Sequence, residues 1–408
     1  MDDIKKLALT ADAAMFESTG ERPFCGSFIQ DTRRSSGYTP AELRDRFSRR
    51  GISNYIDVNG RKIPIQNAAM PGGRKIPLLK AMLTTACERD CNYCGFRAGS
   101  NERRVTFKPE TMAKTYNDIY QAGLLDGLFL SSGIFAGGPN TQNRMLDVAE
   151  ILRTKLDYRG YLHLKIMPGA ERDQILRAMQ FADRISVNLE APNPDRLSFL
   201  APTKQFTDEL LQPLRWINEI RRSVPTNRGW CGRWPSSTTQ FVVGPAGESD
   251  LEILSTVSKL HQIHGLTRAY FEAFTPVHGT PLENHPAENP LREHRLYQAS
   301  FLLRDYYFDL EELPFSHDGL LPISTDPKLA YAKSTLAEKP IEINNASRTE
   351  LLRIPGIGPR GANTILRCRR QGRIRYLSDL RKFGIIAERA APYITLDGHR
   401  TPQQLSFW

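Results

Sequence analysis

Short apolar runs rich in β-branched residues alternate with amphipathic stretches of helical length from residue 81 onward. This alternation is typical of βαβ units, in which helices connect the parallel strands of one sheet. We therefore predict an α/β domain with six such units. The predicted strands are 81–85, 127–131, 161–166, 184–189, 238–243 and 269–273, and the predicted helices are 110–121, 143–154, 170–181, 207–222 and 249–264.

The chain after the last predicted strand contains a long helix and a connector. The helix is predicted over 290–309, and its arginines and aromatic residues could hold phosphate and stack bases, or could equally seal a barrel. These residues are Arg292, His294, Arg295, Tyr297, Arg304, Tyr306 and Tyr307. The proline-bearing stretch 314–340 is interpreted as a connector. The expected domains are 1–80 (N-terminal extension), 81–275 (α/β domain), 276–340 (extension and connector) and 341–408 (small all-α domain).

The last of these domains begins with clear helix signals. Ser347 and Glu350 have the spacing of a capping box, which predicts a helix start at this point. Gly356 and Gly358 then bracket a tight hairpin before a second helix from Pro359. A degenerate second hairpin is predicted at 380–385.

Length and composition limit the class of protein. The 408 residues suit two or three domains, and the six cysteines show no regular disulfide framework. The first residues are charged and lack an apolar signal core, and no run of about 18 or more apolar residues occurs. We expect a cytoplasmic protein with no membrane partner.

Positive charge is concentrated at the C-terminal end. The formal net charge is +10, and residues 341–408 contain 12 arginines and lysines against 5 acidic residues, an excess of seven. A basic module of this kind indicates a polyanionic partner, usually nucleic acid. A solvated basic face is the alternative interpretation.

The strongest chemical signal is a C-x3-C-x2-C run formed by Cys87, Cys91 and Cys94. Three thiolates from one loop bind three irons of a cubane iron–sulfur cluster and leave the fourth open to an outside ligand. Structural zinc is the main alternative, but it needs a fourth ligand, and the next cysteines are Cys25 and Cys231. A thiol redox pair at Cys91 and Cys94 would leave Cys87 unexplained.

This motif resembles that of the radical S-adenosylmethionine (radical SAM) superfamily, with Tyr93 in its aromatic position. The resemblance implies a partial (β/α)6 TIM-like barrel, a [4Fe–4S] cluster and SAM as cofactors, and cleavage of SAM to a 5′-deoxyadenosyl radical. The family often has a Gly-Gly-Glu segment after its second strand, where this chain has Ser131, Ser132 and Gly133 and lacks the glutamate. The other expected SAM contacts are Asn188, Glu190 and Gly244.

Three further side chains are candidates for catalysis. Lys165 ends the third predicted strand, Cys231 lies in a loop before the fifth, and His278 lies in the turn-rich segment 271–281, which could cap the active site. The ordinary interpretations are a surface lysine, an inert packed thiol and a solvated histidine.

The hairpin near Gly356 resembles a helix-hairpin-helix module. In such modules the amides at the hairpin and at the start of the second helix bind a DNA phosphate without reading the bases. The matching residues here are Gly356, Ile357 and Gly358, with Arg360, Arg367, Arg369, Arg370 and Arg373 supplying positive charge. A scaffold for protein contacts is the alternative use.

The chain resembles a radical SAM family assigned to DNA modification or repair. The resemblance lies in the order of its parts, which are the cysteine loop, the barrel, the arginine-rich helix and the hairpin tail that ends at 403–408. The resemblance implies an enzyme whose nucleic-acid partner is DNA rather than RNA and which receives electrons from a donor such as flavodoxin or ferredoxin. One alternative is a radical SAM enzyme acting on a small molecule or protein, with the tail as a docking module. Another is a non-catalytic metal-binding protein that binds nucleic acid.

Overall fold

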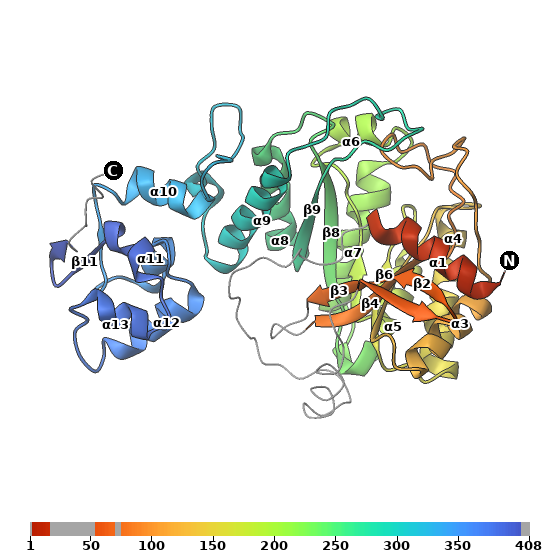
Figure 1. Ribbon diagram of the computed structural model, residues 1–408, viewed down its shortest axis with the longest axis horizontal. Coiled ribbons are helices and arrows are strands. Elements are labelled where there is room, and N and C mark those ends of the chain that lie inside the picture. Colours follow the sequence, from red (N-terminus) through yellow and green to blue (C-terminus); the bar gives the residue numbers. More distant parts are fainter. Residues whose placement is uncertain (1, 17–53, 70–74, 401–408) are drawn as a thin grey trace. The chain divides into compact units, whose positions relative to one another are not determined.

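The structure, a computed structural model, describes residues 2–16, 54–69 and 75–400. The chain divides into two compact units (Figure 1). Unit 1 comprises Met1–Gly247 and Leu260–Glu288, and unit 2 comprises Glu248–Lys259 and Asn289–Trp408. The predictions that concern Cys25 and residues 403–408 lie outside the described residues.

Unit 1 contains a curled sheet in which β3 to β9 follow one another in sequence order. All neighbouring pairs are parallel except β3 with β4, which are antiparallel. Figure 1 shows β8 and β9 running across the direction of β3 and β4, so the sheet curls. The prediction of a parallel α/β sheet is confirmed. The strands are β3 (Gln66–Ala69), β4 (Lys75–Met82), β5 (Gly127–Ser131), β6 (Tyr161–Lys165), β7 (Arg184–Ser186), β8 (Ser236–Val243) and β9 (Arg268–Ala273).

Helices join the parallel strands of unit 1. Most predicted helices are present within a few residues, and the short α6 is an addition. The elements are α1 (Asp3–Ala13), a 3-10 turn (Ala14–Phe16), the hairpin β1 (Tyr55–Val58) and β2 (Arg61–Pro64), α3 (Pro109–Gln121), α4 (Gly138–Glu150), a π-helical turn (Ile151–Lys155), α5 (Arg172–Phe181), α6 (Pro194–Leu200), a second π-helical turn (Phe206–Leu211), α7 (Gln212–Ser223), 3-10 turns at Thr226–Arg228 and Trp230–Gly232, and α8 (Asp250–His264), which starts in unit 2 and ends in unit 1.

Two predicted strands have wrong bounds. The first predicted strand, 81–85, corresponds to β4, which spans Lys75–Met82. This strand therefore begins inside the expected N-terminal extension. Pro77 and Lys80 hide this strand in the sequence, because proline and lysine are uncommon in central strands. The regular part of β7 ends at Ser186, well before residue 189. Glu190 has a φ of +64°, and this left-handed backbone interrupts the extended chain.

Unit 2 is mainly helical, but it also contains a small sheet with the order β10-β11-β12. The prediction of an all-α C-terminal domain is therefore wrong in this detail. Its elements are α9 (Pro290–Asp305), a 3-10 turn (Leu310–Glu312), α10 (Pro327–Thr335), β10 (Ile341–Glu342), α11 (Arg348–Arg353), α12 (Pro359–Cys368), α13 (Leu377–Lys382), α14 (Ala387–Ala390), a 3-10 turn (Ala391–Tyr393), β11 (Ile394–Leu396) and β12 (His399–Arg400).

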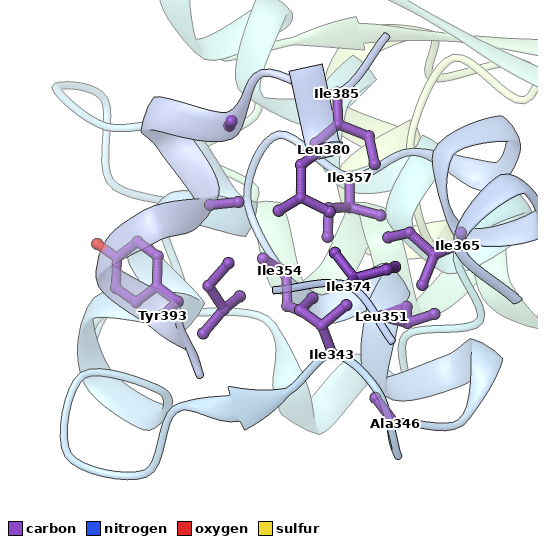
Figure 2. Packing of buried hydrophobic residues seen from close by; sticks show 14 of the residues in the cluster. Ile343, Ala346, Leu351, Ile354, Ile357, Ile365, Ile374, Leu380, Ile385 and Tyr393 are labelled. Atoms are coloured by element: carbon purple, nitrogen blue, oxygen red, sulfur yellow. The ribbon is translucent and has the colours of Figure 1, made fainter. Parts of the chain in front are cut away.

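One apolar cluster holds the C-terminal part of unit 2 together (Figure 2). Leu351, Ile357, Ile365 and Leu380 come from the helices and turns on both sides of the first hairpin and pack within it. Ala332 of α10 belongs to the same cluster. The stretch 314–340 is thus more than a connector, because α10 buries part of its surface in this core.

The arginines of α9 are engaged within unit 2. Arg292 is buried and forms an ion pair with Asp250 at 2.8 Å, and it also donates a hydrogen bond to the Glu248 carbonyl at 2.6 Å. Arg295 donates to the Ile323 carbonyl at 2.9 Å. These two arginines therefore stabilise unit 2. None of the helices within 2–16, 54–69 and 75–400 has the length and apolar character that a bilayer span needs.

Candidate active site

The cysteine loop leaves the sheet at the carboxyl end of β4. Its base is closed by backbone hydrogen bonds from Thr85 N to Val105 O at 2.9 Å and from Phe107 N to Leu83 O at 2.9 Å. The guanidinium of Arg104 lies inside the loop and donates to the carbonyls of Thr85, Phe96 and Arg97 at 2.8 to 2.9 Å. A single arginine thus satisfies several carbonyls that have no partner in regular secondary structure.

The three cysteines of this loop lie within electrostatic range of one another. Burial raises the pKa of the Cys91 thiol, with Cys87 among the lesser influences. Burial, followed by the charge of Cys91, raises the pKa of Cys94 to about 12. Cys87 is half-buried, and its Sγ accepts a hydrogen bond from Ile134 N at 3.4 Å. The three thiols therefore lie close together, with Cys91 buried and Cys87 and Cys94 half-buried.

This donor set fits an iron–sulfur cluster. Within the described residues, no three Cys, His, Asp or Glu side chains converge closely enough to hold a single metal ion. A cubane does not require that convergence, because each thiolate binds a different iron. Metal binding would also supply the charge that favours deprotonation of the Cys91 and Cys94 thiols, whose pKa values are raised. The residues that would hold the cluster are Cys87, Cys91 and Cys94.

The turn after β5 packs directly against the cysteine loop. Gly133 N donates to Thr84 O at 2.7 Å, and a Cβ at Gly133 would collide with the Ala86 carbonyl oxygen. Glycine is required here by this close approach. Ser131 and Ser132 precede it and are buried, and the Ser132 hydroxyl donates to the Gly133 carbonyl at 2.7 Å. The predicted Ser131–Gly133 segment therefore lies beside the cysteines.

Tyr93, Glu190 and Lys204 form a polar network next to the cysteines, in which Tyr93 is half-buried. The Tyr93 hydroxyl donates a hydrogen bond to the Glu190 carboxylate. Lys204 Nζ lies 3.2 Å from Glu190 Oε1, and the two side chains are only 8% and 5% exposed. Cys91 and Cys94 also interact electrostatically with Lys204. The structure thus brings together two residues that the sequence analysis named separately.

The pKa values of this network follow from its charges. Burial alone would raise the pKa of the Glu190 carboxyl, but Lys204 and Lys165 outweigh it and the pKa lies below its usual value. Burial alone would lower the pKa of Lys204, but Cys91 and Glu190 outweigh it and the pKa is raised. Burial, and then the Glu190 charge, raise the pKa of Tyr93. Glu190 and Lys204 are therefore a buried ion pair at neutral pH.

The other two predicted SAM contacts lie on the β8 side of the sheet. Asn188 Nδ2 donates to Gln240 Oε1 at 3.4 Å, and Gln240 Nε2 donates to Glu272 Oε2 at 2.6 Å. Gly244 has a φ of +112°, and a Cβ there would lie 2.5 Å from Glu288 Oε2. The space beside Gly244 is thus occupied by the Glu288 side chain.

The three catalytic candidates occupy different places. Lys165 ends β6, and its charge acts on Glu190. Cys231 is exposed in a turn that precedes β8, which places it at the amino end of the sheet, opposite the cysteine loop. The His278 side chain is fully exposed and lies 3.2 Å from Glu283. Only Lys165 is therefore placed with the site residues.

The segment that contains His278 nevertheless reaches the cysteine loop. A Cβ at Gly95 would lie 3.4 Å from Val277 Cγ1, so Val277 packs against the residue that follows Cys94. Val277 therefore contacts the cysteine loop, and the capping of the site by 271–281 stays a prediction.

The first hairpin of unit 2 forms as the sequence predicts. Ser347 N donates to the Glu350 carboxylate at 2.7 Å, and Glu350 N donates to the Ser347 hydroxyl at 3.2 Å, which confirms the capping box. Gly356 has a φ of +84°, and a Cβ there would lie 2.5 Å from the Ile386 carbonyl oxygen. Both the conformation and the close approach require glycine. Gly358 is the N-cap of α12.

The residues predicted to bind nucleic acid fall into two groups. Arg360, Arg367 and Arg370 are exposed on α12 and just after it. Arg369 instead donates to the carbonyls of Ile343 and Ala346, so its charge serves the fold of this unit. The Ile357 side chain is buried in the apolar cluster, and its carbonyl accepts a hydrogen bond from Lys328 at 2.6 Å.

Lys204 is the main functional residue that sequence reasoning missed. It lies in a polar loop after α6 and has no motif spacing to the cysteines. The nearby ion pair between Arg89 and Glu209 was also missed, although it ties the cysteine loop to the same region. Buried ion pairs of this kind are recognised by the apolar residues that surround the two charges. Those residues come together only when the chain has folded.

Comparisons with known proteins give one family match and several structural matches. Residues 82–260 match the family described as Radical SAM superfamily. Among solved structures, methylornithine synthase (PylB) is 15% identical with a TM-score of 0.44, over 55% of this chain and 61% of that one. The FeFe-hydrogenase maturase HydG from Carboxydothermus hydrogenoformans is 14% identical with a TM-score of 0.44, over 55% of this chain and 51% of that one. The search of curated proteins returned no match.

Proposed function

Residues 82–260 form a radical SAM superfamily domain, and from this premise we propose that the protein is a radical SAM enzyme that modifies or repairs DNA. The superfamily uses a [4Fe–4S] cluster and SAM. When bound, the cluster supplies an electron that splits SAM into methionine and a 5′-deoxyadenosyl radical, which removes a hydrogen atom from the substrate. A small electron carrier such as flavodoxin or ferredoxin is the expected donor.

One observation carries the enzymatic part of the proposal. Three cysteines of one loop lie close together at the carboxyl end of a parallel strand, inside the matched segment. Ligands of curled parallel sheets gather at this end of the strands. Three thiolates would leave one iron open, so the donor set suits a reactive centre better than a closed structural one.

The chain's own residues would hold and orient these groups. The Tyr93–Glu190–Lys204 network would fix the cysteine loop against the chain that follows β7, because its members are hydrogen bonded and Glu190 and Lys204 are buried. Ser131 and Ser132 would offer hydroxyl and carbonyl groups to the SAM ammonium, in place of the glutamate that the chain lacks. Val277 would help to exclude water at the cysteine loop.

The C-terminal part of unit 2 supports nucleic acid as the substrate. Two pairs of helices, α11–α12 and α13–α14, are each joined by a short turn that contains a glycine with positive φ, Gly356 or Gly384. This arrangement suits a helix-hairpin-helix module. The excess of seven positive charges in 341–408 would add a salt-dependent attraction for phosphates.

The function is tested by following hydrogen transfer from DNA. The reconstituted, dithionite-reduced protein is given SAM and a deuterated DNA oligonucleotide, and the released 5′-deoxyadenosine is analysed by mass spectrometry. We expect deuterium in the product with DNA and less with a deuterated RNA of the same sequence. Release of unlabelled 5′-deoxyadenosine in both reactions would contradict the DNA substrate but not the radical chemistry. No release at all would contradict both.

The exposed arginines of the hairpin region give a second prediction. We expect the triple substitution Arg360→Gln, Arg367→Gln and Arg370→Gln to weaken DNA binding at least tenfold in 50 mM salt. The attraction between the arginines and the phosphates is strong at this low salt concentration. The slope of log K against log salt should fall by roughly 0.9 for each phosphate that the variant no longer neutralises. Fluorescence anisotropy at several salt concentrations measures both quantities.

The matched control for this triple variant is a set of three exposed arginines on unit 1. Arg159, Arg172 and Arg228 are exposed, and their replacement by glutamine removes the same charge. An equal loss of affinity in both variants would show that binding depends on net charge and would count against the hairpin as the DNA site.

A second candidate function keeps the radical chemistry but has a small-molecule substrate. The observation that favours it is the buried sheet face that carries His163 and Thr238, whose polar side-chain atoms have no hydrogen-bond partners among the described residues. In this case the hairpin region would be a docking module. The deuterium experiment separates the two candidates.

A further inference from the structure

The two faces of the parallel sheet in unit 1 differ in chemical character. The register pairs Lys80 with Phe129, Phe129 with His163, and His163 with Arg184, so these residues lie on one face. On the same face, Lys165 pairs with Ser186, and Ser186 pairs with Thr238. The intervening residues, such as Leu128, Leu130, Leu162 and Leu164, are buried and apolar.

Ile76, Leu78 and Phe129 form an apolar cluster on this face, but its buried polar residues are unusual for a parallel sheet. Strands covered on both sides normally read as continuous apolar runs, because neither face meets water. Here Lys80 is 3% exposed, His163 is 1% exposed and Thr238 is 0% exposed. Charged and polar groups at this depth require partners, or their burial is costly.

Several polar groups of the sheet have no hydrogen-bond partner in the part of the chain that the structure describes. Both ring nitrogens of His163, the Ser131 hydroxyl and the Thr238 hydroxyl are buried and unpaired there. They come from β6, β5 and β8. The His163 ring contacts Phe129 in an edge-on arrangement, with the ring centroids 4.5 Å apart. A buried imidazole with two unpaired nitrogens indicates a site for a hydrogen-bonding ligand.

The charges around His163 are positive. Burial, followed by the charges of Arg184, Lys165 and Lys80, lowers the pKa of the imidazole well below its usual value. The ring is therefore neutral and has one donor and one acceptor nitrogen. Arg184 is oriented by hydrogen bonds to the Ser236 and Tyr270 hydroxyls at 3.1 and 2.9 Å. A ligand that complements this environment carries negative charge and oxygen atoms.

We name these residues the inner-face cluster: Lys80, His163, Lys165, Arg184 and Thr238. We propose that the inner-face cluster binds an anionic group of the substrate, a phosphate or a carboxylate. This inference rests on the proposed function, because it treats the inner face as the substrate site of that enzyme. A phosphate would come from a nucleotide, and a carboxylate would come from a small organic acid.

The test observes His163 directly. Full-length reconstituted protein is labelled with ¹⁵N-histidine, and the His163 ring resonances are identified by their loss in His163→Gln. The protein is titrated with inorganic phosphate and, separately, with sodium acetate at constant ionic strength. We expect saturable shifts of the His163 resonances, and the anion that binds more tightly identifies the substrate group. Because the titration contains neither SAM nor reductant, its outcome is independent of 5′-deoxyadenosine release.

A matched pair of lysine variants makes the test specific. We expect Lys80→Met to weaken anion binding at His163 at least tenfold, whereas Lys114→Met, at an exposed position of α3, changes it less than twofold. Lys165→Met, at a less buried position, serves the same purpose where Lys80→Met does not fold. His163 resonances that do not respond to either anion would overturn the proposal. Equal affinities in the Lys80, Lys165 and Lys114 variants would also overturn it.

Discussion

Cys91→Ala is expected to reduce 5′-deoxyadenosine release below detection and to lower the bound iron sharply. Cys91 is buried within the loop and interacts with both other cysteines, so its loss leaves two thiolates for a cluster that needs three from the protein. The wild-type protein should carry roughly four irons per chain and matching sulfide. Iron and sulfide analysis, the visible absorption spectrum and product release measured by chromatography check these results.

The control for this substitution is Cys368→Ala. Cys368 is a half-buried cysteine at the end of α12 and lies outside the cysteine loop. We expect this variant to keep its iron and its product release within twofold of the wild type. Zinc in place of iron in the wild-type protein would contradict the cluster and favour the structural-metal alternative. The visible spectrum would show this, because zinc thiolates are colourless. Product release that survives Cys91→Ala would contradict the role given to this loop.

Lys204→Met is expected to lower the free energy of unfolding by about 3–5 kcal/mol, because it leaves the buried Glu190 carboxylate without its ion-pair partner. It should also reduce the iron retained on dialysis, since the Lys204 ammonium attracts negative charge on Cys91 and Cys94. Urea unfolding and iron analysis measure the two effects. Lys62→Met, at an exposed position of β2, is the control and should change stability by less than about 0.5 kcal/mol.

A double substitution distinguishes the ion pair from simple packing. Lys204→Met combined with Glu190→Gln removes both charges, so we expect it to be more stable than the sum of the single effects predicts, by about 1–3 kcal/mol. Strict additivity in this cycle would show that the two side chains stabilise the protein independently. That result would contradict the network as the support of the cysteine loop.

Much of the α/β fold could be predicted from the sequence. Strands such as β5 and β6 are short apolar runs between amphipathic helices, and their bounds were predicted within one residue. β4 was misplaced because Pro77 and Lys80 break the apolar pattern. Lys80 is tolerated in the strand because it points to the polar inner face, and a sequence read in isolation does not reveal that this face exists.

In the C-terminal region too, local features could be predicted from the sequence and long-range contacts could not. The capping box at Ser347 and the glycine at 356 are local features, and the structure forms both as predicted. The role of Arg369 is not local, because its guanidinium binds carbonyls more than 20 residues away in the sequence. The number of arginines in 341–408 is therefore larger than the number whose charge is available to a ligand.

The sequence by itself determined the chemistry that three closely spaced cysteines can perform, because the spacing of 87, 91 and 94 places three thiols in one loop whatever the rest of the chain does. It also determined the parallel sheet and the hairpin turns, since these depend on short-range periodicity and on glycine. The tertiary structure alone decided which charges are buried together. Glu190 and Lys204 become a pair across a loop and a short helix, and His163 comes to lie among Lys80, Lys165 and Arg184 because successive strands lie side by side in the sheet. Electrostatic interactions depend on distance and burial, and both are set only when the chain has folded.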